Sequence, residues 1–80
     1  MSFELYRDVV VPRDMDDVGL HAGDVGTVVE RHDIRGVEEE GYSVEFFDMT
    51  GNTVALVYPS RQRLRGPTRQ DRPAARALTA

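Results

Sequence analysis

The chain of 80 residues is long enough for one small domain, and its composition excludes several classes of protein. It contains no cysteine, which excludes a disulfide framework, a thiolate zinc site and a cysteine nucleophile. No apolar run is long enough to span a membrane, and residues 1–5 lack the pattern of a signal peptide. We therefore expect a soluble, cytoplasmic protein that is stabilised by packing alone.

The net charge of −4 is distributed unevenly along the chain. Residues 1–58 contain four arginines and thirteen acids, whereas residues 59–80 contain six arginines and a single acid, Asp71. An acidic body is therefore followed by a basic tail. Because acidic side chains repel phosphate, any contact with nucleic acid has to come from the arginines near the carboxyl terminus. These arginines are Arg61, Arg63, Arg65, Arg69, Arg72 and Arg76.

The first part of the chain predicts two strands joined by a long loop. Residues 5–12 contain a β-branched run, Val9–Val11, and predict the first strand. Residues 23–31 predict the second strand, in which Gly26 indicates a bulge or a close approach of another backbone segment. The segment 13–23 between them is acidic and has no apolar period, so we expect an irregular loop.

A hairpin is predicted in the middle of the chain. Residues 42–47 alternate between apolar and polar side chains, which is typical of a strand with one buried face, formed here by Tyr42, Val44 and Phe46. Asp48 and Gly51 are spaced for a type I turn that ends in a left-handed glycine. Residues 53–58 are apolar on both faces and predict a central fourth strand.

A short fifth strand is predicted over residues 61–65, with Leu64 pointing inward and the arginines outward. Five short strands favour an all-β fold, a small five-stranded SH3-like barrel spanning residues 1–65. A domain this small needs nearly all the apolar residues before Pro59 for its core, so we expect no large exposed apolar patch. Residues 66–80 predict a disordered or weakly helical tail.

Four segments carry a resemblance to a known family: LYRDVVV (5–11), GLHAGDVGTVVE (19–30), YSVEFFDMTGNTVALV (42–57) and RLR (63–65). Together they resemble a bacterial family of short proteins that is defined only as domain of unknown function 4926. The resemblance implies an SH3-like fold and a place beside toxins in toxin–antitoxin-like gene pairs. It implies no catalytic residue, and it does not extend to the tail after Gly66.

The sequence contains no convincing catalytic or metal-binding motif, so we expect a non-enzymatic protein without a cofactor. Asp14 and Asp16 begin a calcium-loop pattern, but the required oxygen ligands are replaced by Val18 and Val25. The two histidines, His21 and His32, lie on different predicted elements and favour surface positions over a metal site. Candidate nucleophiles such as Ser43 and Ser60 have no histidine near them in the sequence.

Protein recognition remains as the most plausible class of function. We expect a binding module that acts as an antitoxin-like or accessory partner of a neighbouring gene product, such as a toxin or an enzyme subunit. One candidate surface is an acidic face formed by the two loops, although such acids also simply keep a small domain soluble. Its residues are Asp14, Asp16, Asp17, Glu38, Glu39 and Glu40.

Two further binding modes stay open. An unpaired edge strand would bind a strand of a partner or of a second copy of the chain, giving a homodimer. The alternative function is a KOW-like RNA-binding barrel, because the Gly23–Val28 step is similar to that of KOW domains. That function would use the arginine-rich tail, since the loops are acidic.

Overall fold

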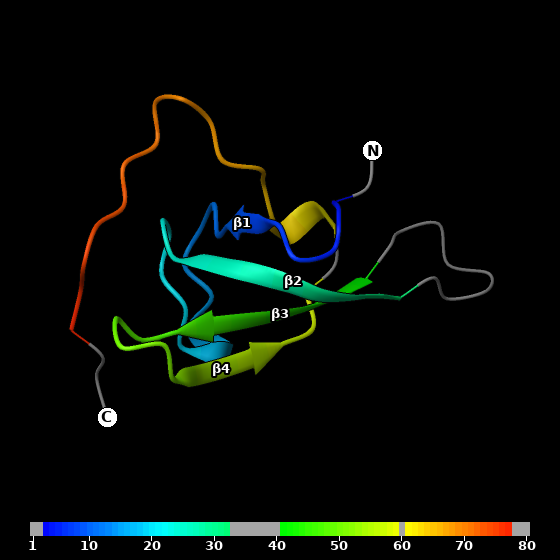
Figure 1. Ribbon diagram of the computed structural model, residues 1–80, viewed down its shortest axis with the longest axis horizontal. Helices are drawn as coiled ribbons and strands as arrows, with labels where there is room; N and C mark the ends of the chain where they lie inside the picture. Colours follow the sequence, from blue (N-terminus) through cyan, green and yellow to red (C-terminus); the bar gives the residue numbers. More distant parts are fainter. Residues whose placement is uncertain (1–2, 33–40, 60, 78–80) are drawn as a thin grey trace.

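Four antiparallel strands, arranged in chain order, form one open sheet (Figure 1). The computed structural model describes residues 3–32, 41–59 and 61–77. The strands are β1 (Asp8–Val10), β2 (Val25–His32), β3 (Gly41–Phe47) and β4 (Thr53–Val57). Two short 3-10 helices are also present, η1 (Asp16–Val18) and η2 (Arg61–Arg63). The prediction of an all-β fold is confirmed.

The prediction of five strands closed into an SH3-like barrel is wrong for the described residues. Residues 61–65 begin as η2, and only Arg65 continues the sheet, as an isolated bridge to Val10 at the outer side of β1. Val10 N–H donates to the Arg65 carbonyl at 2.8 Å, and Arg65 N–H donates back at 3.0 Å. The chain has to cross from β4 to β1 at this point. Residues 61–63 of the predicted strand form η2 within that crossing, so they do not pair with the sheet.

The hydrophobic core lies on one face of the sheet, between the strands and the two 3-10 helices. Tyr42, Val44 and Phe46 of β3 are buried, as their alternation predicted, and Leu64 points inward after η2. Met15 and Leu20, on either side of η1, complete this side of the core and pair through two backbone hydrogen bonds of 2.9 and 3.1 Å. The other core residues are Val9, Val11 and Val28.

Gly26 marks a close contact between β2 and β3. A Cβ atom at this position would lie 2.6 Å from Cγ1 of Val44 and 2.8 Å from Cε2 of Phe46. The close approach is therefore made by side chains of β3 against the backbone of β2, and not by a second backbone segment. The irregularity in the pairing of β2 with β3 lies further along, between Val28 and Glu30.

The prediction that β4 is a central strand is wrong, because β4 lies at the edge of the sheet (Figure 1). Its inner side chains, Ala55 and Val57, pack against the core, but Leu56 remains 46% exposed. The expectation that nearly all apolar residues before Pro59 are buried is wrong as well. The exposed large apolar residues are Leu5, Tyr6, Val18, Val25, Phe47, Met49, Val54, Leu56 and Tyr58.

The carboxyl-terminal segment, predicted to be disordered or weakly helical, contains no helix over residues 66–77. The segment leaves the body near β1 and descends on the left in Figure 1, and Arg76 near its end binds Asp24 in the loop between β1 and β2. Two ion pairs fix its course. Arg65 binds Asp71 within the segment, and Arg76 binds Asp24 of the body.

Candidate functional site

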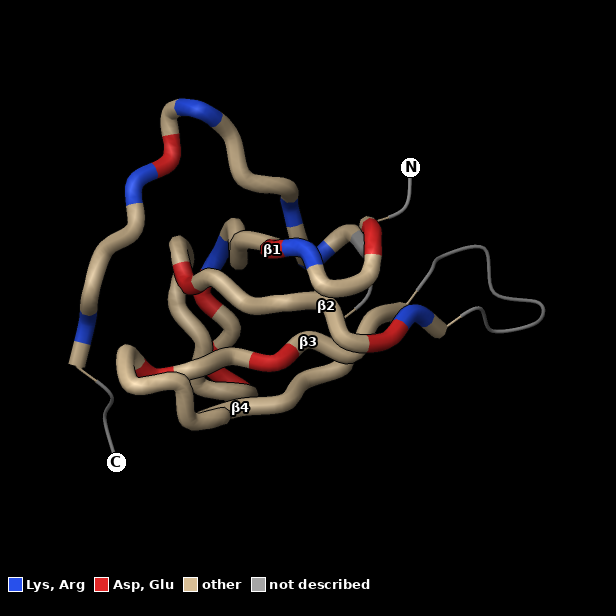
Figure 2. The backbone as a smooth tube through the Cα atoms, viewed as in Figure 1, with Lys and Arg blue, Asp and Glu red and all other residues tan. Residues whose placement is uncertain are grey.

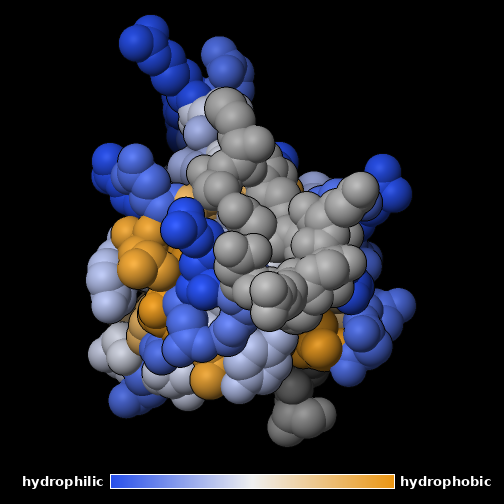
Figure 3. All heavy atoms as spheres, turned by 90° about the vertical axis from the view of Figure 1, so that its right-hand side faces the viewer, coloured by the Kyte–Doolittle hydropathy of each residue, from blue (hydrophilic) through white to orange (hydrophobic). Residues whose placement is uncertain are grey.

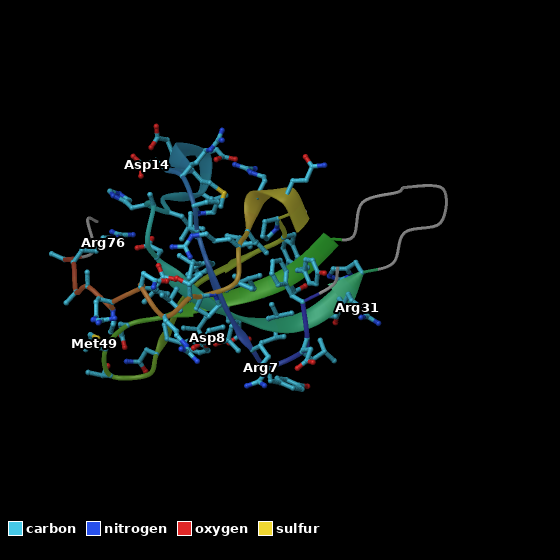
Figure 4. The ribbon with its side chains drawn as sticks, turned by 90° about the horizontal axis from the view of Figure 1, so that it is seen from above. Arg7, Asp8, Asp14, Arg31, Met49 and Arg76 are labelled. Atoms are coloured by element: carbon cyan, nitrogen blue, oxygen red, sulfur yellow. The ribbon has the colours of Figure 1, made fainter. Side chains whose placement is uncertain are left out.

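The predicted acidic face is only partly brought together. Asp14, Asp16 and Asp17 gather around η1, on the core side of the sheet and opposite Arg7 and Asp8 (Figure 4). Asp14 Oδ1 accepts the Ala22 N–H at 2.8 Å and so fixes the loop. The other three predicted residues, Glu38, Glu39 and Glu40, lie outside the described residues.

Asp24 is an acidic residue that the sequence analysis did not select. Its carboxylate accepts two hydrogen bonds from the Arg76 guanidinium, at 2.8 Å from Nε and 2.7 Å from Nη2, and a third from the His21 N–H at 2.9 Å. Arg76 holds the pKa of Asp24 below its ordinary value. The two residues are 52 positions apart, so no local pattern in the sequence signals this contact.

The arginines from Arg65 onward are separated from one another. Arg65, Arg72 and Arg76 each bind oxygen atoms of this chain. Arg65 binds both carboxylate oxygens of Asp71 at 2.7 and 2.8 Å, and this contact lowers the pKa of Asp71 strongly. Arg72 donates to the carbonyls of Arg69 and Asp71, each at 3.1 Å. Figure 2 shows the basic residues spread along the path of the chain, with an acidic residue between them.

The remaining predicted arginines precede the tail. Arg63 lies 3.7 Å from Asp17, and the side chain of Arg61 lies outside what the structure describes. The predicted row of three guanidinium groups on one strand is therefore not formed by Arg63 and Arg65, which turn to different acids.

The backbone of β4 offers hydrogen-bonding groups on its outer side. Ala55 and Val57 pair with Phe46 and Val44 of β3, and the carbonyl of Pro59 accepts the Tyr42 N–H at 3.0 Å. Hydrogen-bonded and non-hydrogen-bonded pairs alternate along an antiparallel ladder, so the N–H and C=O groups of Leu56 point away from β3. The described sheet has no strand beyond β4, which leaves this row available for another strand.

The outer face of the sheet beside β4 is mainly apolar. The register places Asp8, Thr27, Glu45 and Leu56 in one row across the four strands. Exposed apolar side chains lie on either side of this row: Val25, Phe47 and Tyr58. We call the outer side of β4 together with this part of the face the β4 surface, defined by Glu45, Phe47, Val54, Leu56 and Tyr58.

A second polar group, also missed by the sequence analysis, lies at the other end of the outer face. His32 Nε2 is 2.7 Å from Ser43 Oγ, and His32 Nδ1 is 3.2 Å from Glu30 Oε1. The order of these groups resembles a hydrolytic triad. Ser43 is only 5% exposed, however, so its hydroxyl has little room for a substrate carbonyl. The arrangement explains why the predicted wet face of the third strand contains a buried serine.

A shallow hollow lies between residues 4–5 and the carboxyl-terminal half of β2. It has a volume of 480 Å³ and is lined by Glu4, Leu5, Val29, Glu30 and Arg31. Figure 3, which views this end of the molecule, shows hydrophobic patches divided by hydrophilic side chains. Both carboxylates of its lining already have partners, since Glu4 binds Arg7 and Glu30 binds His32, so the lining gives no chemical class of ligand.

Within the described parts of the chain, no three His, Asp or Glu side chains come together in a way that could hold a metal ion. His21 is exposed, and His32 binds Ser43 instead. Among the same residues, no helix is long and apolar enough to cross a membrane.

The fold and its surface define a small all-β domain with one open, apolar edge strand. The chain belongs to the family described as Domain of unknown function (DUF4926), whose model matches residues 5–65. The comparison with curated proteins and the comparison with solved structures gave no match. The family match ends at Arg65, so the tail from Gly66 lies outside it.

Proposed function

We propose that the protein is a non-catalytic binding module that accepts a strand of a partner protein at β4. The observation that supports this function is the exposure of apolar side chains on an edge strand, Leu56 at 46% and Tyr58 at 69%. Exposed edge strands are usually protected by charged residues or proline, because they otherwise pair with other chains. Residues 53–58 contain neither.

In this proposal the partner is the product of a neighbouring gene, and the protein acts as its accessory or antitoxin-like subunit. Strand addition supplies affinity through main-chain hydrogen bonds, while alternate side chains supply specificity. At β4 the main-chain groups come from Leu56 and the side-chain contacts from the β4 surface. Binding by the acidic residues around η1 is less favoured, because Asp14 already accepts a hydrogen bond from the Ala22 N–H and Asp17 lies 3.7 Å from Arg63.

RNA binding through the tail is also less favoured. Arg65 and Arg76 each bind a carboxylate, so a phosphate would have to displace Asp71 or Asp24. The guanidinium groups along the tail are moreover spread out instead of forming one basic stripe (Figure 2).

The test compares the affinity of the purified product of the adjacent gene for the unmodified protein with its affinity for the variant Leu56→Lys. A buried, unpaired ammonium opposes strand addition, so we expect the dissociation constant to rise more than about tenfold. Val18→Lys is the matched control, since Val18 is 40% exposed but belongs to η1 and not to the β4 surface. Calorimetry measures both affinities. Equal affinities for the two variants and the unmodified protein would contradict binding at β4.

A further inference from the structure

The β4 surface contains one feature that restricts its partner further, the carboxylate of Glu45. This side chain lies on β3, directly beside Leu56 in the row across the sheet. It is partly buried, and its Oε2 accepts the Thr53 hydroxyl at 3.3 Å. The hairpin 41–59 contains two acids, Glu45 and Asp48, and no Arg or Lys. The β4 surface is therefore apolar with a negative charge at its centre.

We propose that the strand bound at β4 carries an Arg or Lys opposite Leu56, with apolar residues two positions away on each side. This inference rests on the proposed function, because it specifies the partner of the same surface. The recognised class is an extended, basic protein segment with the pattern apolar, any residue, Arg or Lys, any residue, apolar.

The first argument is the cost of covering Glu45. A long side chain of a strand added at β4 lies across Leu56 and displaces water from Glu45, and an ionised carboxylate loses much of its solvation when it is covered without a cation. A long apolar side chain would cover the carboxylate without offering it a hydrogen bond. A guanidinium or ammonium group instead forms a charge-assisted hydrogen bond with the carboxylate.

The second argument is the state of the other acid in the hairpin. Asp48 Oδ1 accepts hydrogen bonds from Thr50 N–H, Thr50 Oγ1 and Asn52 N–H at 2.8 to 2.9 Å. These bonds hold the turn between β3 and β4, so the oxygen of this carboxylate already has its hydrogen-bond partners within the turn. Glu45 is left as the acid of the hairpin that a partner strand can meet.

The third argument is distance, which selects a long side chain. The added strand would lie two strand spacings from β3, or about 9 to 10 Å. Arg and Lys lay their aliphatic stems along apolar surface while the charged head reaches a polar group. The exposed side chain of Leu56 provides that surface, and the head then reaches Glu45. Shorter polar residues cannot cross Leu56.

The test uses the full chain, labelled with nitrogen-15, and three synthetic peptides. The first peptide, acetyl-TVTRTVT-amide, contains the proposed pattern; in the second and third, leucine and glutamate replace the arginine. Titration followed by amide chemical shifts gives each affinity. We expect shifts at Leu56 and Tyr58, binding roughly three- to tenfold tighter for the arginine peptide than for the leucine peptide, and the weakest binding for the glutamate peptide.

The variant Glu45→Gln separates charge from shape. It should abolish the preference for arginine over leucine, and the leucine peptide should bind this variant more tightly than it binds the unmodified protein, because no ionised carboxylate is then covered. Asp16→Asn, a matched loss of one charge on η1, should retain the preference. Folding of both variants is verified by the same amide spectra.

The outcomes distinguish the two proposals. If all three peptides shift the β4 amides with equal affinity, the inference about arginine is wrong and strand addition stands. If no peptide shifts these amides, strand addition itself fails, and the inference fails with it. If the unmodified protein sediments as a dimer that Leu56→Lys dissociates, a second copy occupies β4, which also overturns the inference.

Discussion

Gly26 is the residue at which the packing of the sheet is tightest. Its missing side chain allows Val44 and Phe46 to lie against the backbone of β2. A methyl group there would be 2.6 Å from Val44 and 2.8 Å from Phe46, distances that require both core side chains to move. The role of this glycine is steric and does not depend on a left-handed backbone, unlike that of Gly51, whose φ is 92°.

We therefore expect Gly26→Ala to lower the free energy of unfolding by about 1 to 3 kcal/mol, the usual cost of overpacking a core. Urea denaturation followed by circular dichroism measures the change. Gly66→Ala serves as the control, because a Cβ at that position meets nothing within 4 Å. An equal effect of both substitutions would show that the close contact does not determine the loss.

Asp48 is one of the residues that make the stability of the fold depend on pH. The hydrogen bond from the Asn52 N–H, followed by that from the Thr50 hydroxyl, lowers its pKa from 3.8 to about 2. A carboxyl group with a lowered pKa in the folded state stabilises the fold fully above its unfolded pKa. That contribution is lost as the pH falls from 3.8 toward about 2.

Asp48→Asn should therefore be less stable than the unmodified protein near neutral pH, and the difference should narrow as the pH falls through this window. Thermal unfolding at a series of pH values measures it. Glu4→Gln is the control, since the exposed carboxylate of Glu4 accepts a single long hydrogen bond of 3.4 Å from Arg7. A difference that stays constant with pH would contradict the role of the ionised carboxylate.

Among the structural elements, the tail between Gly66 and Ala77 is held to the body by side-chain charge. Arg76 and Asp24 are 30% and 16% exposed, so their ion pair is better shielded than that between Arg7 and Glu4, whose side chains are at least 75% exposed. The pKa of Asp24 is lowered chiefly by the hydrogen bond from Arg76. Contacts of this kind weaken in salt, whereas those of the core do not.

We expect Arg76→Gln to release the end of the tail. Backbone order parameters of Ala74, Ala75 and Ala77, measured by nitrogen-15 relaxation, should fall from values near 0.85 to below about 0.6. Arg72→Gln should leave them unchanged, because Arg72 donates to carbonyls of its own segment. High salt should reproduce the effect of Arg76→Gln, and rigid alanines in that variant would contradict the attachment.

The elements that local sequence patterns specify were predicted correctly. The alternation of Tyr42, Val44 and Phe46 and the turn between Asp48 and Gly51 were both confirmed, with Gly51 N–H donating to the Asp48 carbonyl at 3.1 Å. The prediction failed for β4, because apolar residues on both faces indicate either a central strand or an edge strand whose outer side is covered by a partner. Only the order of the strands distinguishes these cases.

Three further features were not predicted because they depend on contacts between distant parts of the chain. The alternation of Arg61, Arg63 and Arg65 predicted a strand, yet the chain uses the first three residues of that segment as η2. The contact between Asp24 and Arg76 connects residues 52 positions apart, and the triad-like group of Glu30, His32 and Ser43 depends on the pairing of β2 with β3. Neither contact has a local sequence pattern that could have revealed it.

For the whole molecule, the sequence shows the division into an acidic body and a basic tail. It does not show that the two parts form ion pairs with each other. Nucleic-acid binding was predicted to be unlikely except through the tail arginines. In the structure Arg65 and Arg76 bind acids of the same chain, so part of the opposite charge is neutralised internally. The assignment of residues 1–65 as the folded unit remains a prediction, and the family match covers 5–65.

The two edges of the sheet differ, and this difference determines what kind of assembly the protein can form. At β1, both backbone groups of Val10 that face outward are occupied by Arg65. Extension of the ladder is therefore directed past β4 alone. An interface that propagates needs complementary surfaces at both ends of the unit, whereas a unit with one terminated end gives a closed complex. Under the proposed strand addition, the expected stoichiometry is therefore one partner strand per chain, a finite complex and not a fibre.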